Sequence, residues 1–332
     1  MKHSKKLLAA LATAASIGFF SAPLAAEQKI DLLTSPFGTG SYVLGNALEQ
    51  IVNRTGGPVK VTSSESPGLV FNVKKINSDP ELRKSTIMSY TPALNQMATS
   101  GAAPFDRAYP GAKLIANYNL NSLWLAGVGE SVKTREDLVG KRVALGRPPQ
   151  IGWTIQPLDL VDHGWGLKDK IEFEMLGLDQ GVKSAIAGRV DAIVVGGYLD
   201  PESGQFMASP HTNELLAAGV TLHHISWGKA AVEATTAVGA ALSPATIPAG
   251  AMEGLDKNIE GFTSAVAWCA YDEFDEEAAY RITKAVIEHV GEFAEYHALG
   301  KLMSRSALVA GWDTTDIHPG ALRAYREAGI IK

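Results

Sequence analysis

The stretch KIDLLTSPFGTGSYVLGNALEQIV, residues 29–52, holds a strand, a glycine turn and a helix in one short run. Lys29–Leu33 is typical of a β-strand, and Gly38-Thr39-Gly40-Ser41 supplies the small residues of a tight turn. Beyond the turn, apolar residues recur at helical spacing, at Leu44, Leu48, Ile51 and Val52. A strand that leads directly into a helix is the repeating unit of parallel α/β folds.

The same alternation continues along the chain. We expect strands at Pro58–Thr62, Ser85–Ser89, Lys113–Asn117, Ser122–Val128, Arg142–Leu145, Glu172–Leu176, Asp191–Val195 and Phe262–Cys269. We expect helices at Leu69–Ile76, Pro92–Ala98, Glu136–Val139, Thr154–His163 and Gly181–Ala187. A longer helix is capped by Asp275 and carries a buried stripe of Ala278, Ile282, Val286 and Val290. The pattern predicts an α/β fold with mostly parallel sheets covered by helices.

The N-terminus has the order of features that defines a secretory signal peptide. Lys2, Lys5 and Lys6 precede the apolar run Leu7–Phe20, and small residues lead to a cleavage site after Ala26. The run is shorter than the ~20 apolar residues that a membrane-spanning helix needs. We therefore predict residues 1–26 to be a signal peptide and the mature protein to be periplasmic.

Length and charge narrow the class of protein. A mature chain of 306 residues exceeds the size of an ordinary single core, which predicts two domains. Because no low-complexity linker separates them, we expect strands to join the domains. Removing the three lysines of residues 1–26 leaves 27 basic and 35 acidic residues, a net charge of −8. This balance argues against nucleic acid and anionic lipid as partners. Cys269 lies in an apolar run and is interpreted as a small buried side chain.

Signatures of catalysis are missing from the sequence. It contains no zinc-protease helix motif, Walker phosphate loop or nucleophile elbow. His223 and His224 are adjacent on a strand and point to opposite faces, so they are poorly placed to share a metal. The turn GTGSYV, residues 38–43, is half of a dinucleotide fingerprint, because Val43 occupies the third glycine position. It still presents backbone N–H groups at a helix start, which favours an anion, although a merely tight turn is the alternative. We expect no cofactor and no catalytic or metal site.

Several strings in this order resemble TAXI-type solute receptors, the substrate-binding subunits of one branch of TRAP transporters. They are FGTGSY (37–42), LVGKRVALG (138–146), GRVDAIVVGG (188–197), TIPAG (246–250), YRITKA (280–285) and HPGA (318–321). The resemblance implies a periplasmic-binding-protein-like flytrap of two α/β domains joined by hinge strands. Domain I would hold residues 27–128 and 245–332, and domain II residues 129–244. The protein would be a monomer that captures a small carboxylate, such as a dicarboxylate or an amino acid, and delivers it to an ion-coupled TRAP permease.

Two other functions stay open from the residues themselves. One is a receptor of an ABC transporter with the same general fold. The other is an exported hydrolase that uses the same cleft, which would need an activated nucleophile beside a histidine.

The resemblance and the turn chemistry together select the candidate ligand-binding residues. The first domain would contribute Thr39, Gly40, Ser41, Tyr42, Glu65, Ser66, Tyr90 and Thr91. The second would contribute Arg147, Gln150, Trp153 and Thr154, with Gly197 and Tyr198 near the hinge. Ordinary core packing is the alternative for Tyr90, Trp153 and Tyr198.

Two candidate loops depart from the family pattern. SESPG (64–68) brings in Glu65, and GRPPQIGWT (146–154) brings in Arg147 and Trp153. Three arrangements of the charges are open: Arg147 binds a ligand carboxylate, it pairs with Glu65 across the cleft, or both charges are solvated. We favour an organic acid held by Arg147.

Overall fold

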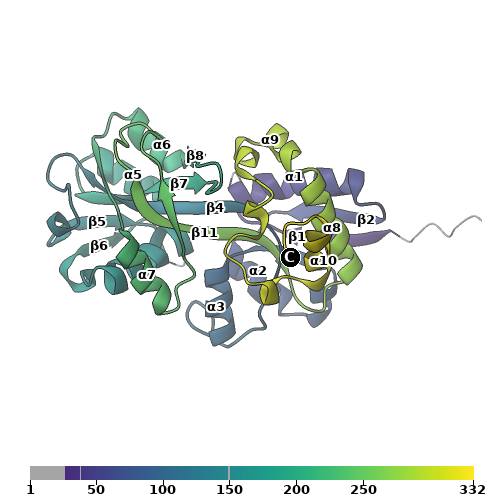
Figure 1. Ribbon diagram of the computed structural model, residues 1–332. Coiled ribbons are helices and arrows are strands. Elements are labelled where there is room, and N and C mark those ends of the chain that lie inside the picture. Colours follow the sequence, from purple (N-terminus) through teal and green to yellow (C-terminus); the bar gives the residue numbers. More distant parts are fainter. Residues whose placement is uncertain (1–26, 38, 149) are drawn as a thin grey trace, which may run out of the picture.

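The computed structural model describes residues 27–37, 39–148 and 150–332, so the predicted signal peptide lies outside the described residues. Figure 1 shows two lobes joined by a pair of long strands, β4 (Lys113–Val128) and β11 (Ile259–Ala270), which run from one lobe into the other. In the described part of the chain, no helix is both long and apolar enough to cross a bilayer. The fold is the expected α/β class.

The first lobe contains a parallel group of strands in the order β2-β1-β3, namely β1 (Gln28–Leu33), β2 (Val59–Ser64) and β3 (Thr86–Tyr90). Helices α1 (Gly40–Thr55) and α2 (Leu69–Ile76) connect these strands, and α3 (Pro92–Ser100) leads from β3 to β4, as the sequence predicts. In α1 the residues Leu44, Leu48, Ile51 and Val52 are all fully buried, because their helical spacing turns one face to the sheet.

The second lobe has its own parallel group in the order β7-β5-β6. It comprises β5 (Arg142–Leu145), β6 (Glu172–Met175) and β7 (Ala192–Leu199), with α5 (Leu178–Ile186) before β7. The predicted helix at Thr154–His163 is longer and irregular: π-helical turns at Ile151–Ile155 and Leu160–Gly164 flank α4 (Gln156–Asp159). The sequence places His223 and His224 on a strand, and they lie in β9 (Leu222–Ile225). Four further elements were not predicted: α6 (Pro210–Ala217), α7 (Lys229–Ala237), β8 (Phe206–Ala208) and β10 (Ser243–Ile247).

The C-terminal helices return to the first lobe. Asp275 caps α8 (Glu276–Glu288) as predicted, its carboxylate accepting a 2.8 Å hydrogen bond from the Ala278 N–H. The helix ends before Val290, which is only half-buried in a 3-10 turn, so the predicted stripe is one residue too long. The chain closes with α9 (Phe293–Tyr296) and α10 (Pro319–Glu327). Further 3-10 turns span Pro80–Lys84, Glu136–Leu138, Lys168–Lys170, Val290–Glu292, Ala298–Leu302, Ala307–Val309 and Thr314–Asp316.

β4 corrects the prediction of two separate strands at 113–117 and 122–128. Asparagine is depleted in strands, so residues 118–121, which include Asn119 and Asn121, resemble a loop between two strands. In the structure this run stays paired, because Asn119–Asn121 lie opposite Ser264–Val266 of β11. The pairs β3-β11, β11-β4 and β4-β7 are antiparallel, so the centre of the sheet is antiparallel and only the outer groups are parallel.

Two apolar cores lie on either side of the centre. Along β4 the core changes between Tyr118 and Leu123, and along β11 it changes between Phe262 and Ala267. Between them Leu120 and Ala265, which are direct cross-strand partners, form a small cluster with Ala307. Both long strands therefore cross from one lobe to the other. Ile247, Leu255, Ile259 and Phe262 belong to the core of the second lobe.

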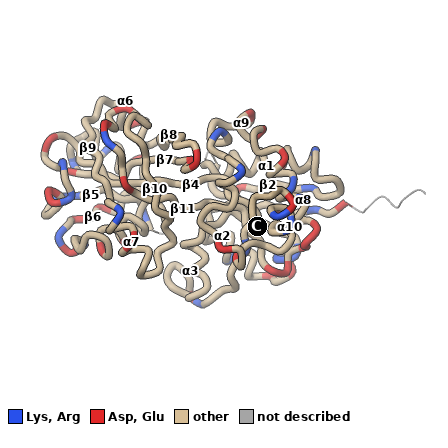
Figure 2. The backbone as a smooth tube through the Cα atoms, in the orientation of Figure 1, with Lys and Arg blue, Asp and Glu red and all other residues tan. Residues whose placement is uncertain are grey.

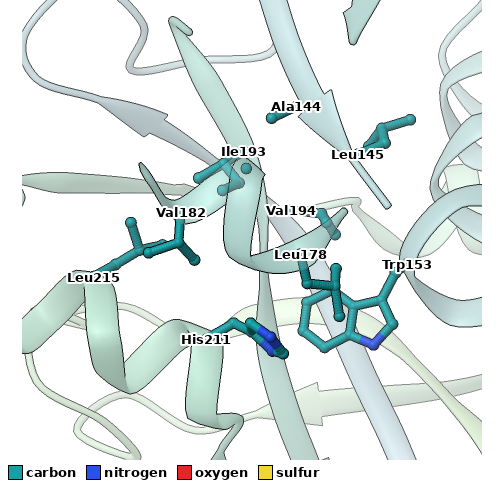
Figure 3. Close-up of a pocket in the computed structure, with 10 residues that line it drawn as sticks. Ala144, Leu145, Trp153, Leu178, Val182, Ile193, Val194, His211 and Leu215 are labelled. Carbon is teal, nitrogen blue, oxygen red and sulfur yellow. The ribbon is translucent and has the colours of Figure 1, made fainter. Parts of the chain in front are cut away.

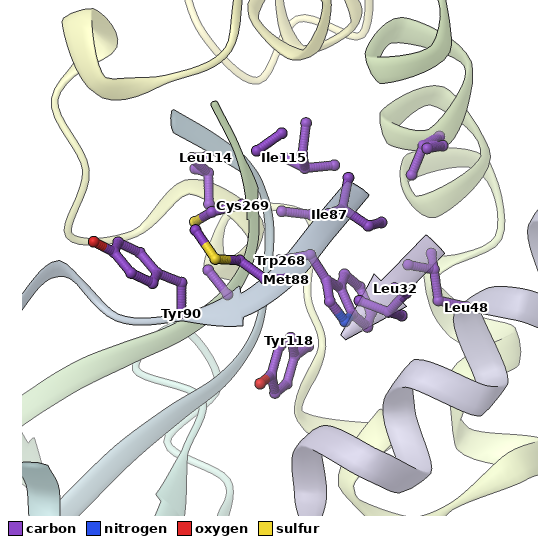
Figure 4. Close-up of a cluster of buried hydrophobic side chains, with 14 of the residues drawn as sticks. Leu32, Leu48, Ile87, Met88, Tyr90, Leu114, Ile115, Tyr118, Trp268 and Cys269 are labelled. Carbon is purple, nitrogen blue, oxygen red and sulfur yellow. The ribbon is translucent and has the colours of Figure 1, made fainter. Parts of the chain in front are cut away.

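The first core also explains the single cysteine. Cys269 of β11 is fully buried near Met88 and Leu114 (Figure 4). Burial raises the pKa of the Cys269 thiol well above its usual value, so the thiol stays neutral and packs as an apolar group. The interpretation of Cys269 as a buried small side chain is confirmed.

Candidate ligand-binding site

The middle of β4 carries polar side chains at the point where the strand passes between the lobes. Asn119 and Asn121 lie in regular register with β11, so their side chains share one face of the sheet. Asn119 is buried and Asn121 is half-buried. From Leu114 to Val128 β4 has no charged residue, and Figure 2 shows the charges gathered mainly away from this centre. The face of β4 that carries Asn119 and Asn121 therefore forms a neutral, polar surface between the two cores. We call this surface the floor of the candidate site.

The first turn of α1 meets this floor from the first lobe. A Cβ added at Gly40 would lie 2.6 Å from Asn119 Nδ2, so only glycine lets the helix start approach this closely. Thr39 is the N-cap: its hydroxyl accepts from the Tyr42 N–H at 3.3 Å and donates to the Pro36 carbonyl at 2.7 Å. The N–H end of α1 is thus held against Asn119.

Ser41 fixes the same turn from below. Its hydroxyl is hydrogen-bonded to the hydroxyl of Tyr118, a buried residue of β4. Burial raises the pKa of Tyr118 strongly, against the opposing effect of the Ser41 hydrogen bond, so the phenol is neutral at all ordinary pH values. Tyr118 has no partner in the β11 register, which shifts at this point, and its side chain is therefore free to turn under α1.

The helical segment at Ile151–Gly164 meets the floor from the second lobe. A Cβ added at Gly152 would lie 3.1 Å from Leu123 Cδ1 and 3.6 Å from Asn121 Nδ2. The loop before it is closed by Gln150, whose side-chain Oε1 accepts from the Arg147 N–H at 3.0 Å and whose carbonyl accepts from the Thr154 N–H at 3.0 Å. Two helix starts from opposite lobes therefore approach neighbouring side chains of one strand.

β7 and β11 complete the floor. Tyr198 and Ser264 both lie directly opposite Asn121, one on each neighbouring strand, so all three side chains share one face. Tyr198 is half-buried, and burial raises the pKa of its phenol. Gly197 has a different role, because a Cβ there would collide with the Met207 carbonyl of β8.

Three buried polar atoms, on the floor and on the helical segment that meets it from the second lobe, have no hydrogen-bond partner among the described residues. They are Asn119 Oδ1, Thr154 Oγ1 and Gln156 Oε1. Leaving such a group unpaired costs about 1–3 kcal/mol, so clustered orphans indicate a place where a ligand or water completes the structure. Within the described ranges no set of three or more His, Cys, Asp or Glu side chains could hold a metal ion.

Other candidate residues serve the loops and the core. Tyr90 is fully buried in the first core and donates to Asn95 Oδ1 at 3.2 Å (Figure 4). Thr91 is the N-cap of α3 and accepts from the Leu94 N–H at 3.0 Å. Ser66 is buried and donates to the Thr34 carbonyl at 2.9 Å. Each hydroxyl thus has a partner within its own lobe.

Trp153 turns into the second lobe. Its indole is 6.0 Å from the His211 ring, edge to face, and lies beside Leu178 in a small apolar pocket (Figure 3). Val182 and Ile193 line the same pocket. In this structure the Trp153 indole therefore packs against apolar side chains of the second lobe, which is the arrangement expected of an ordinary core residue.

The two charges of the unusual loops lie apart. Glu65 is exposed, and its Oε1 accepts from the Phe37 N–H at 3.0 Å, which ties two loops of the first lobe together. Arg147 is exposed, and its guanidinium lies beside Gly177 of the second lobe. Within the described residues no ion pair joins Arg147 to Glu65, so the latch is not formed here.

Sequence reasoning missed Asn119, Asn121, Gln156 and Ser264. The signal that could have found the first two is the alternation of Asn117, Asn119 and Asn121 inside an otherwise apolar run. Gln156 and Ser264 give no such local signal, because their significance comes from a contact between distant segments.

Comparison with known proteins agrees with this architecture. Residues 32–329 match the NMT1-like family. The chain belongs to that family. Among solved structures it is similar to a TctC solute binding protein from Polaromonas, solved without ligand, with a TM-score of 0.52 at 13% identity over 85% of this chain and 89% of the other. That likeness shows a shared fold and confirms the periplasmic-binding-protein-like class.

Two further structures score slightly lower. The sulfonate-binding protein SsuA from Methylobacillus flagellatus has a TM-score of 0.49 at 14% identity, over 90% of this chain and 76% of the other. An R. palustris protein solved with adipate has a TM-score of 0.48 at 13% identity, over 83% and 87%.

Proposed function

We propose that this protein is a solute receptor that closes its two lobes on a small organic acid and delivers the acid to a membrane permease. The observation that carries the proposal is the approach of two helix starts, at Gly40 and Gly152, to Asn119 and Asn121 from opposite lobes. Helix N-termini present free N–H groups and a positive dipole end, which together suit a carboxylate. A site divided between lobes is filled only when the lobes come together.

The contributions of the lobes follow from this geometry. The first turn of α1, with Thr39, Gly40, Ser41 and Tyr42, would hold the acid from the first lobe, and Gln150 and Thr154 would face it from the second. Arg147 would act as a cation at the outer rim, and Tyr198 would line the floor. Glu65 and Ser66 would support the α1 loop.

The hinge of the receptor is proposed at the crossings of β4 and β11. Leu120 and Ala265 pair between the two cores, and rotation there leaves both cores intact. We therefore propose the domain boundaries near residues 120 and 265, in place of 128 and 245.

We further propose which class of permease receives the acid. The strings shared with TAXI-type receptors favour an ion-coupled TRAP permease, and the N-terminal segment favours action in the periplasm. Reconstitution of the neighbouring permease in liposomes tests this point. Uptake that needs both this receptor and an ion gradient supports it, whereas uptake that needs ATP hydrolysis contradicts it.

Ligand capture is tested on protein purified without refolding. Native mass spectrometry should detect a retained acid, and small-angle scattering should give a smaller radius of gyration once acid is added back. An acid at 100 times its dissociation constant should stabilise the fold by about 2.7 kcal/mol. A screen of mono- and dicarboxylates that shifts no unfolding midpoint would refute the proposal.

A further inference from the structure

Gln156 joins the second lobe to the crossing segment of β11. Its Nε2 donates to Ser264 Oγ at 2.8 Å and approaches the Ala241 carbonyl at 3.5 Å. A carbonyl oxygen can only accept, so this contact fixes which end of the amide is nitrogen. The other end, Oε1, is therefore an acceptor.

That acceptor is buried and unused. Gln156 is 2% exposed, and its Oε1 has no partner among the described residues. It lies on the same side as the floor, because a Cβ added at Gly152 would be 3.8 Å from Gln156 Oε1 and 3.6 Å from Asn121 Nδ2. The oxygen thus lies beside the junction of the two lobes.

Asn119 provides a second acceptor on the same floor. It is 6% exposed, its Nδ2 faces Gly40, and its Oδ1 also lacks a partner among the described residues. The floor therefore combines N–H groups at two helix starts with two buried amide oxygens. The N–H groups at the helix starts bind an anion, and the amide oxygens accept hydrogen bonds from a donor.

We propose that the solute carries a hydroxyl or ammonium group next to its carboxylate, and that Gln156 Oε1 and Asn119 Oδ1 accept hydrogen bonds from this group. This inference rests on the proposed capture of an organic acid. A plain dicarboxylate is ionised at neutral pH and offers only acceptors, so it leaves both amide oxygens unpaired or facing negative charge. Hydroxy and amino acids satisfy them. Gln156 and Asn119 are thereby specificity-determining residues.

The test compares acids that share a carbon skeleton and differ only in the donor. Glutarate, 2-hydroxyglutarate and glutamate form one series, and succinate, malate and aspartate form another. Calorimetry on the wild-type protein should show at least one donor-bearing acid binding at least about tenfold more tightly than its plain parent, as expected for one buried acceptor satisfied. Gln156→Met, similar in length but unable to accept, should reduce that ratio to within about threefold while binding of the plain acid changes little.

A matched control removes a buried amide far from the floor. Asn77→Met deletes a side chain that donates to the Val73 carbonyl and the Tyr271 hydroxyl in the first lobe, and it should keep the wild-type ratio. Thermal unfolding verifies that each variant is folded, and the wild-type series decides alone if Gln156→Met is not. Equal or tighter binding of the plain acids overturns this inference and leaves acid capture standing. Failure of every acid to bind overturns both.

Discussion

Ser304 Oγ donates a 3.1 Å hydrogen bond to Asp200 Oδ1 and links the C-terminal segment of the first lobe to the residue that follows β7. Asp200 follows β7 and is 5% exposed, and Ser203 donates to its other oxygen at 2.7 Å. A second link joins Ser306 to Glu202. Along the chain, Ser304 lies between Met303 and Leu308, which belong to the first core. Leu199, which directly precedes Asp200, belongs to the second core.

Ser304→Ala should therefore favour the open form. A hydrogen bond to a carboxylate contributes about 1.5–3 kcal/mol, and one present only when the lobes are closed biases closure by up to that amount. We expect ligand affinity to fall roughly fivefold or more and the ligand-free protein to become larger in small-angle scattering. Ser78→Ala, which removes an exposed hydroxyl bonded to the Lys75 carbonyl, is the control. Unchanged dimensions and affinity in Ser304→Ala would show that the link does not control closure.

Gly40→Ala should weaken binding more than it weakens the fold. The added methyl group would meet Asn119 Nδ2 at 2.6 Å and Leu299 Cδ1 at 3.1 Å, so either the Asn119 side chain or the start of α1 must shift. Either shift disturbs the contact between α1 and Asn119 and should lower acid affinity at least about tenfold, since the groups placed around the ligand lose their geometry. Gly291→Ala is the matched control, because a Cβ there meets nothing within 4 Å. Calorimetry measures the loss of acid affinity, and urea unfolding measures the loss of stability. If Gly40→Ala binds acid as tightly as the wild-type protein does, α1 is not part of the binding site.

His224 should make stability depend on pH below neutrality. Burial, aided by the neighbouring His223, lowers the pKa of His224 to about 4, and Trp124 Nε1 donates to its Nδ1 at 3.0 Å, which requires a neutral ring. Because the folded pKa lies below the unfolded value of about 6.5, this stability is complete above pH 6.5 and is lost as pH falls towards 4. The loss should be roughly 1–3 kcal/mol.

Urea unfolding between pH 7.5 and 4.5 measures this effect. His224→Gln should flatten the dependence, because glutamine accepts from the indole without titrating. His163→Gln alters an exposed histidine and should follow the wild-type curve. If the slopes of wild type and His224→Gln coincide, another group is responsible.

Substitution of Arg147 tests whether its guanidinium attracts the acid from a distance or binds the acid's carboxylate directly. Its guanidinium is exposed and lies beside Gly177, so we expect Arg147→Gln to weaken acid binding by less than tenfold, and less still at high salt. Loss of a direct bidentate contact would instead cost roughly 2–5 kcal/mol. Calorimetry at two salt concentrations separates these cases. A large loss that salt does not reduce would place Arg147 on the ligand.

The sequence by itself determined the local elements of the first lobe. Leu44, Leu48, Ile51 and Val52 recur at helical spacing, and all of them are buried in α1. Asp275 signals a helix start because its carboxylate can satisfy a free N–H three residues later. The apolar run around Cys269 signals a buried strand. In each case the deciding interaction joins residues close together in the chain, so spacing and residue type are sufficient.

The tertiary structure alone decided the floor of the candidate site. β4 is continuous through its asparagines because β11 and β7, each more than 70 residues further along the chain, pair with it there. Gln156 is significant only through Ser264, 108 residues away, and Gly40 only through Asn119. Sequence periodicity states which face of an element is apolar but not which strand will lie beside it. The register between remote strands therefore chose the side chains that meet where the lobes join.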